Sequence, residues 1–395
     1  MKTVGIICEY NPFHLGHANH IARTRAVLGI DCAVVCIMSG NFVQRGDYAI
    51  FSKYARAETA VRCGADLVIE MPTPYVLSSA ECFAAAGVYA LDRFGVCDYI
   101  SFGSESGDLE VLKDAAEALI SPEAVTSVKE SLGEGISYAS AMQKAADSVM
   151  GIHSETLKSP NNLLGIEYLK AISRYKSPIQ PITIKRVGGE HDGDKGYSAS
   201  AVRKKLLHGE NTQWFIPHAA YVINMKEISE GRGPVSMRAC ELAILSRLRA
   251  VEDFSQLRGA VEGLDNRLAR CAAMEPTIER ILERAKTKRY AMSRLRRMLM
   301  CACLGITAAD TLEPPPYIRV LAMNHNGMRV LKTAQSKSEL PIITKPASVK
   351  KMPERAVEVF KKEATVTDFY VLAYQNENER AGGQEWRRTP IVIEN

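Results

Sequence analysis

The chain has 395 residues, of which 46% are hydrophobic and 24% are charged, so its composition is that of a globular protein long enough for two domains. No apolar run approaches the length that crosses a bilayer, and a strand-like run follows the first residues in place of a signal-peptide pattern. The ten cysteines are scattered without a Cys-x-x-Cys pair, which favours buried, reduced thiols. These features predict a cytoplasmic protein that spans no membrane.

Charge is distributed unevenly along the chain. Residues 1–200 hold 18 Lys and Arg against 23 Asp and Glu, whereas residues 201–395 hold 32 against 22. The first half therefore carries a net charge of −5 and the second half a net charge of +10. A basic second half suggests a polyanionic partner, although solvated helices with basic surfaces would give the same balance.

Strand-like and helical patterns alternate in the first half, and this alternation predicts a Rossmann-like parallel sheet with helical crossovers. From about Trp214 the alternation stops and helical patterns dominate. We therefore predict an α/β domain over residues 1–205 and a mostly α-helical, basic domain over residues 206–395. The expected strands are 4–8, 32–38, 67–69, 99–102 and 182–185, and the clearest expected helices between them are 53–63, 80–93 and 109–119.

The junction between the first strand and the first helix holds two histidines. His14 and His17 stand three residues apart there, with Gly16 between them. A helix N-terminus presents unpaired N–H groups and a partial positive charge, so histidines at this place can add donors to a phosphate site. Two histidines alone also fit a surface helix or packed rings, and they make at most half of a zinc site. We predict a phosphate site without metal ligands.

Polar loops follow two later strands, at the sheet edge where ligands of parallel sheets bind. Residues 39–46 follow the second strand, and Lys53 and Arg56 stand at the start of the next helix. Residues 103–106 follow the fourth strand and form a small-residue turn that could lie against a base or a ribose. The sequence favours ligand loops over plain surface turns at both places.

Two further helix starts carry polar side chains. Capping explains one residue of the pair Asn161 and Asn162, and the other is available to a ligand. Ser198 or Ser200 can cap a later helix whose first turn carries Arg203. Hydroxyl groups and an arginine at a helix start make a second candidate phosphate site.

These two sites together resemble a known superfamily. His-x-Gly-His on a first strand–helix turn resembles the signature of nucleotidylyltransferases, which attack the α-phosphate of a nucleoside triphosphate and expel pyrophosphate. Residues 198–203, Ser-Ala-Ser-Ala-Val-Arg, resemble in looser form the Ser-x-x-x-Ile-Arg motif that contacts the β- and γ-phosphates there. The two motifs stand in the expected order at the two ends of residues 1–205.

Longer segments narrow the resemblance to bacterial tRNA(Met) cytidine acetate ligases: residues 5–17, 39–46, 65–72, 160–162, 317–322 and 326–327. The resemblance implies an enzyme that uses ATP and acetate to make acetyl adenylate, and that then acetylates N4 of the wobble cytidine of elongator tRNA(Met). Mg²⁺ is expected to accompany ATP, bound through the phosphates. No DNA partner is expected.

The resemblance also implies site residues. His14 and His17 are expected to donate to the α-phosphate, and Arg203 is expected to hold the departing β- and γ-phosphates with hydroxyl groups near it. We therefore expect the ATP-binding residues Ile7, Cys8, Glu9, Tyr10, Asn11, Pro12, Phe13, His14, Leu15, Gly16, His17, Ala18, Asn19, His20, Gly103, one or both of Asn161 and Asn162, Arg186, Ser198 and Ser200.

The second half contains a short, strongly basic stretch. Residues 281–300 hold seven basic residues against one acidic residue, with Tyr290 among them, and an apolar run at 298–306 follows. Such a stretch favours contact with the tRNA backbone over a merely solvated face. The expected tRNA-binding residues are Lys286, Lys288, Arg289, Arg294, Arg296 and Arg297.

Other patterns in the second half predict helices over 241–251, 264–273, 277–285 and 354–362, a strand over 317–322 and a β-prone run over 367–374. Two rival functions fit parts of the chain. A small-molecule adenylyltransferase would share the histidine motif but leaves the basic half unexplained. A non-catalytic, nucleotide-dependent RNA-binding protein would not need the complete set of His14, His17 and Arg203.

Overall fold

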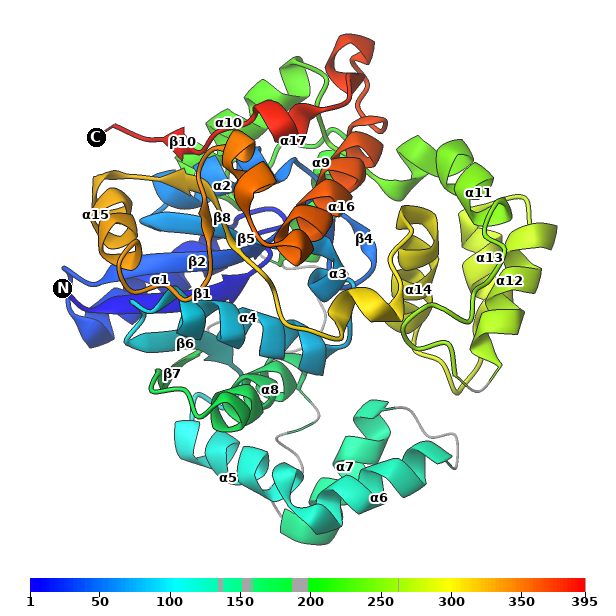
Figure 1. Cartoon of the computed structure of the whole chain (residues 1–395), viewed down its shortest axis with the longest axis horizontal. Helices are drawn as coiled ribbons and strands as arrows, with labels where there is room; N and C mark the ends of the chain where they lie inside the picture. The colour runs from blue at the N-terminus through cyan, green and yellow to red at the C-terminus, as the bar shows by residue number, and fades with distance from the viewer. Residues whose placement is uncertain (134–137, 151–156, 158, 187–197, 262, 395) are drawn as a thin grey trace.

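The computed structural model describes residues 1–133, 138–150, 157, 159–186, 198–261 and 263–394. Its centre is an eight-stranded, mostly parallel sheet with helices on both faces, and a further group of helices stands beside it (Figure 1). This arrangement confirms the predicted α/β class and the helical character of the C-terminal region.

The five strands predicted in the first half form the parallel part of the sheet: β1 (Thr3–Cys8), β2 (Ala33–Ser39), β5 (Leu67–Met71), β6 (Tyr99–Ser104) and β7 (Gln180–Lys185). Three strands from the second half complete the sheet: β8 (Ile318–Met323), β9 (Ile342–Ile343) and β10 (Ile391–Val392). The spatial order is β10-β8-β5-β2-β1-β6-β7, with β9 beside β8, and β8 runs antiparallel to β5. Because the second half supplies these strands, the division of the chain at residue 205 stays a prediction.

Both faces of the sheet are covered. In β2, Val35 and Ile37 pack into the core on one face, whereas Val34 and Cys36 pack into the core on the other. Such strands are apolar throughout because each face is buried. Helices of the first half are α1 (Leu15–Leu28), α2 (Lys53–Arg62), α3 (Thr73–Val76), α4 (Ala80–Phe94), α5 (Leu109–Ile120), α6 (Pro122–Gly133), α7 (Tyr138–Met150), α8 (Pro160–Tyr175) and α9 (Ala199–Leu207).

The predicted helices of the second half are confirmed: three of them differ by small shifts of their ends, and the one predicted over 354–362 extends to residue 371. They and their neighbours are α10 (His218–Ser229), α11 (Glu241–Arg249), α12 (Leu264–Met274), α13 (Ile278–Ala285), α14 (Met292–Leu304), α15 (His325–Ala334), α16 (Glu354–Val371) and α17 (Gln384–Arg387). The β-prone reading of 367–374 is wrong, because most of that run lies in α16. There Phe369 and Tyr370 are buried against the helical core, and this packing outweighs the β propensity of the run.

A buried ionic cluster joins the C-terminal segment to the sheet. Lys53 Nζ lies 2.6 Å from Glu70 Oε1 and 2.7 Å from Glu385 Oε2, and Arg319 Nε lies 3.3 Å from Glu385 Oε1. All four side chains are at most 1% exposed. Burial acts to lower the pKa of Lys53, but Glu385 and Glu70 raise that pKa overall, so the ammonium group stays charged. The cluster therefore ties α17 and β8 to α2 and β5.

We expect Lys53→Met to reduce the free energy of unfolding in urea by about 3–5 kcal/mol, because it leaves buried carboxylates without their cation. Arg62→Met is the matched control, since Arg62 pairs with Glu58 on the exposed face of the same helix. An exposed pair of this kind contributes about 1 kcal/mol or less. Equal losses in the two variants would contradict the role assigned to the cluster.

Candidate active site

The turn between β1 and α1 places His14 at the N-cap of the helix. His14 Nδ1 accepts a hydrogen bond from Gly16 N at 2.9 Å, and His17 Nδ1 accepts one from His14 N at 3.3 Å. The two rings therefore cap the helix reciprocally, with their centroids 3.8 Å apart. A Cβ on Gly16 would stand 2.6 Å from His14 Cε1, so only glycine allows this ring position.

This capping pattern fixes the chemistry of both imidazoles. Because each Nδ1 accepts a backbone N–H, the neutral ring carries its proton on Nε2. Burial, Arg186 and Arg203 lower the pKa of His14 to about 4. Burial and the neighbouring His14 and Arg186 hold the pKa of His17 well below its usual range. Near neutral pH the pair therefore presents two neutral Nε2–H donors.

Arg186 supplies positive charge beside these rings. It follows β7, and a Cβ on Gly103 of the neighbouring strand β6 would lie 3.3 Å from Arg186 Cγ. Burial and Arg186 also lower the pKa of His20 to about 4, and His20 Nε2 lies 3.0 Å from Ser101 Oγ. The structure thus brings Gly103, Arg186 and His20 to the same sheet edge as His14.

Arg203 reaches the site from α9. Its Nη1 donates to the carbonyl oxygen of Asn11 at 2.6 Å, and its Nη2 donates to Ser200 Oγ at 3.0 Å. Ser198 caps the helix by accepting from Ala201 N at 3.2 Å. The structure therefore separates the two hydroxyls, since Ser198 begins the helix and Ser200 lies against Arg203. The segment before Ser198 lies outside the described residues.

The two asparagines at the start of α8 bind the loop after β6. Asn162 is buried, and its Oδ1 accepts from Glu105 N at 2.9 Å and Ser106 N at 3.2 Å. Asn161 is less buried, and its Nδ2 donates to Glu105 Oε1. Neither side chain caps α8, whose N-cap is Ser159. The expected capping role is therefore wrong, because both amides hold the loop that follows Gly103.

Most other side chains of the 7–20 loop anchor it. Cys8, Tyr10 and Phe13 lie in the core beneath the helix, and Tyr10 adopts a left-handed backbone with φ of 46°. Leu15 and Asn19 are exposed. The apolar members of the predicted ATP loop therefore fix its path, whereas its backbone and histidines face the edge of the sheet. The remaining members are Ile7, Glu9, Pro12 and Ala18.

The residues that follow β2 mainly stabilise the fold, although the sequence favours a ligand loop there. Lys53 lies in the buried ionic cluster, and Arg56 is 2% exposed with its guanidinium group on backbone carbonyls. Asn41 Oδ1 accepts a hydrogen bond from Lys53 N at 2.9 Å. The hairpin of β3 (Phe42–Val43) and β4 (Asp47–Tyr48) leaves Arg45 exposed. Lys53 and Arg56 are therefore internal side chains that support the fold.

The basic stretch before and within α14 divides into two parts. Lys286 and Lys288 are exposed, and Lys286 Nζ also donates to the Thr287 carbonyl oxygen at 2.8 Å. Arg296 and Arg297 instead meet the β3–β4 hairpin. The other two expected tRNA-binding residues of the stretch, Arg289 and Arg294, are half-buried. Arg294 Nη2 donates to Gly259 O at 2.9 Å.

The contact with the hairpin is close. Arg297 Nη1 donates to Gln44 O at 3.3 Å, and Arg296 Nη1 lies 3.8 Å from Asp47 Oδ2. A Cβ on Gly46, whose φ is 76°, would overlap the backbone of Arg297. Burial raises the pKa of Asp47 overall, although the backbone N–H of Tyr48 and the charges of Arg296 and Arg203 act to lower it. The basic end of α14 therefore lies near the candidate phosphate site.

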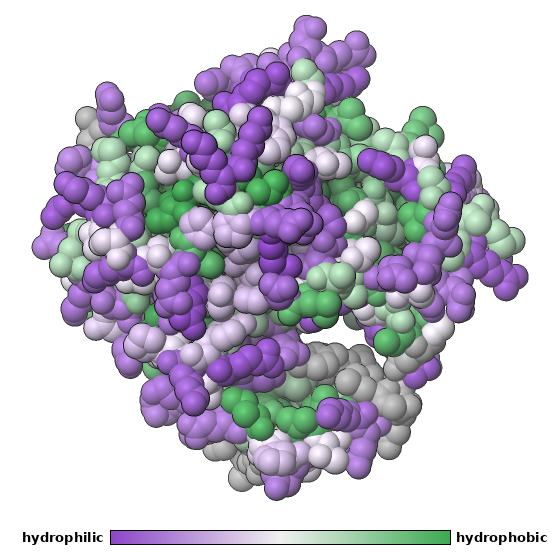
Figure 2. All heavy atoms as spheres, viewed as in Figure 1, coloured by the Kyte–Doolittle hydropathy of each residue, from purple (hydrophilic) through white to green (hydrophobic). Residues whose placement is uncertain are grey.

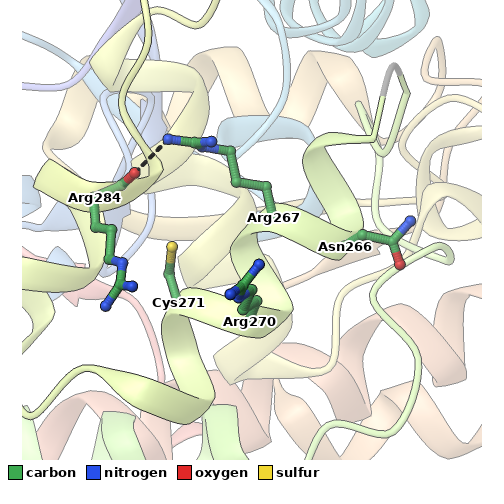
Figure 3. A pocket seen from close by; sticks show the side chains of 5 residues that line it. All are labelled: Asn266, Arg267, Arg270, Cys271 and Arg284. Carbon is green, nitrogen blue, oxygen red and sulfur yellow. Dashed lines mark hydrogen bonds between the residues drawn. The ribbon is translucent and has the colours of Figure 1, made fainter.

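A second basic feature, which sequence reasoning missed, lies on α12 and α13 (Figure 3). A cavity of about 370 Å³ is lined by Arg267, Arg270, Arg284, Cys271 and Asn266. Arg267 Nη2 donates to Arg284 O at 2.6 Å. The i, i+3 spacing of Arg267 and Arg270 in the sequence is the pattern that indicates this feature, because it puts both side chains on one side of α12. Hydrophilic side chains dominate the face of this helical region seen in Figure 2.

The described residues hold neither a candidate metal cluster nor a candidate membrane span. In that part of the chain no group of three or more His, Cys, Asp or Glu is placed to hold a metal ion. None of its helices is both long and apolar enough to cross a membrane. All ten cysteines are free thiols, and seven of them are buried.

Comparisons with known proteins show the family of this chain. The family model described as HIGH Nucleotidyl Transferase matches residues 1–385. The tRNA(Met) cytidine acetate ligase of Acetivibrio thermocellus is 37% identical over the full length of both chains, and that of Caldanaerobacter subterraneus subsp. tengcongensis is 40% identical over 95% of this chain and 96% of its own.

Solved structures of Thermotoga maritima TmcAL match the whole fold. The structure bound with alpha-thio ATP has a TM-score of 0.93 and 32% identity, and the apo structure has a TM-score of 0.94 and 31% identity. Each covers 100% of both chains. By its sequence, its fold and its paired histidines, this chain belongs to the tRNA(Met) cytidine acetate ligase family of HIGH nucleotidyl transferases.

Proposed function

We propose that this protein activates acetate with ATP as acetyl adenylate and then acetylates N4 of the wobble cytidine of elongator tRNA(Met). The observation that carries the proposal is the meeting of two neutral Nε2–H donors, on His14 and His17, with the guanidinium groups of Arg186 and Arg203 at one sheet edge. Neutral donors flanked by fixed positive charge suit a triphosphate. A protein that acts on tRNA belongs in the cytoplasm.

In the first step an acetate oxygen attacks the α-phosphorus of ATP, the bond to the β-phosphate oxygen breaks, and pyrophosphate leaves. His14 and His17 donate to the α-phosphate as charge grows on its oxygens. Arg203, held by Asn11 O and Ser200, binds the departing phosphates. Positioning and charge neutralisation supply most of the rate, because acetate and triphosphate repel each other.

The adenosine lies, in this proposal, against the loop after β6. Gly103 offers a surface without a side chain, beside the aliphatic part of Arg186. Asn161 is the better candidate for direct contact than Asn162, because Asn162 Oδ1 already accepts two backbone N–H groups. Mg²⁺ would accompany ATP and neutralise charge on its phosphates, and this would require no cluster of protein carboxylates.

The tRNA approaches over the basic stretch that ends at α14. Lys288 is exposed and Arg296 lies beside the hairpin that borders the phosphate site. Basic side chains there can bind backbone phosphates while a single-stranded anticodon base is splayed toward the adenylate. The proposed contact surface also includes Lys286, Arg289, Arg294 and Arg297. Of these, Arg297 also supports the hairpin.

We expect His17→Ala to slow acetyl adenylate formation about 10²–10³-fold, because it removes one donor from the α-phosphate. Acetate-dependent exchange of label between pyrophosphate and ATP measures this step. His208→Ala is the control, since His208 is 60% exposed and lies outside the site. Wild-type exchange by His17→Ala would refute the assignment. Exchange with another small substrate but not with acetate would favour a small-molecule adenylyltransferase.

We expect the double variant Lys288→Glu and Arg296→Glu to bind elongator tRNA(Met) at least tenfold more weakly, with a shallower salt dependence, and to keep acetate-dependent exchange. Arg297 is left intact because it supports Gln44. A double charge reversal on exposed α15 residues, Arg329→Glu and Lys332→Glu, is the control. Equal loss of affinity in both double variants would mean that general charge, and not this surface, binds the tRNA.

A further inference from the structure

Glu9 places a carboxylate at the carboxyl end of β1, directly before the histidine turn. Its Oε1 accepts a hydrogen bond from Gln44 N at 2.6 Å. Its Oε2 has no hydrogen bond to any residue that the structure describes, and the side chain is half-buried. One oxygen therefore holds the hairpin loop, while the other remains available to a ligand.

The surroundings of Glu9 differ from those expected for an ATP contact. Burial raises the pKa of its carboxyl group, although Arg56, Arg203 and Arg45 act to lower it. A negatively charged Glu9 beside the candidate phosphate site repels a triphosphate. We therefore infer that this carboxylate has a function other than binding ATP. A carboxylate with a raised pKa accepts a proton more readily than an ordinary one.

The second half of the proposed reaction needs such a group. The exocyclic amine of cytidine is a weak nucleophile, and it must lose a proton as it forms an amide. His14 and His17 are unsuited, since their Nδ1 atoms are occupied and their Nε2 atoms already carry hydrogen. Glu105 is unsuited because Oε1 binds Asn161 and Oε2 accepts from Asn162 N.

Glu9 also lies on the side from which tRNA approaches. The same Gln44 that donates its N–H to Glu9 accepts from Arg297 through its carbonyl oxygen. Gly46, two residues later, packs against the backbone of α14. Glu9 is therefore placed between Arg203 on the adenylate side and the basic end of α14.

We propose that Glu9 is a catalytic residue of acetyl transfer, whose Oε2 takes the proton from N4 of the target cytidine. The amine nitrogen attacks the acetyl carbon, the carbon–oxygen bond to AMP breaks, and AMP leaves with that electron pair. The proton passes from N4 to the Glu9 carboxylate. This role rests on the proposed function and adds to it the group that accepts the proton.

The test separates the two half-reactions in Glu9→Gln, whose amide oxygen can still accept from Gln44 N. Any loss in acetate-dependent pyrophosphate exchange should be much smaller than the loss in acetyl transfer. Single-turnover transfer from preformed acetyl adenylate to elongator tRNA(Met) should fall about 10²–10⁴-fold. In wild type the transfer rate should rise with pH as Glu9 ionises and then level off, and this rise should be missing from Glu9→Gln.

Each other outcome has a distinct meaning. Normal transfer by Glu9→Gln overturns the proposal. Equal losses in exchange and transfer also overturn it, because Glu9 would then serve the ATP site. Asp47→Asn distinguishes the other carboxylate near Arg203, and loss of transfer in that variant alone would give the role to Asp47. Failure of the wild-type protein to acetylate the tRNA would instead refute the proposed function.

Discussion

The buried guanidinium group of Arg56 is the interaction on which the site depends. Its Nη1 donates to Glu9 O, its Nη2 donates to the carbonyl oxygens of Ser39 and Gly40, and its Nε donates to Phe51 O at 3.1 Å. A charged group that is 2% exposed is tolerable only when its donors are satisfied. Arg56 therefore holds together the carboxyl ends of β1 and β2, from which the histidine turn and the β3–β4 hairpin begin.

The histidine turn depends on that fixed starting point. Because β1 ends at a defined place, His14 and His17 can use their Nδ1 atoms to cap α1 and turn their Nε2–H groups outward. The low pKa values of the two rings mean that they contribute donors and no net charge. Positive charge comes instead from the guanidinium groups of Arg186 and Arg203. The donors are thus in place before charge develops on the α-phosphate, which is how such groups stabilise a transition state.

The sequence predicts this part of the molecule well because its signals are local. The strand, the glycine and the paired histidines lie within a few residues of one another, and the alternation of strands and helices gives the sheet. The turn that begins at Gly103 was indicated by its small residues, whereas Arg186 came only from the resemblance, because its closeness to Gly103 arises from the pairing of β6 with β7. No local signal indicates the buried ion pair of Lys53, because its partner Glu385 lies near the other end of the chain.

Long-range packing explains the remaining differences between the sequence predictions and the structure. The strand predicted at residues 317–322 exists, yet nothing local indicates that it joins the sheet of the first half and runs antiparallel to β5. Arg267 and Arg270 line a basic cavity only because α13 brings Arg284 beside them. Periodicity identifies the helices of this region, whereas the surfaces that they form together follow from their packing.

Gln44 connects the two halves of the reaction in space. Its N–H binds the carboxylate of Glu9, and its carbonyl oxygen binds Arg297 of α14. Both of these contacts use backbone atoms of Gln44, and Gly46 lets the hairpin approach α14 closely. The basic helix that we propose for tRNA binding is thus held at a fixed distance from the group that we propose as proton acceptor. Since amide formation requires the amine and its proton acceptor to meet the adenylate together, a short rigid link serves the reaction better than a flexible one.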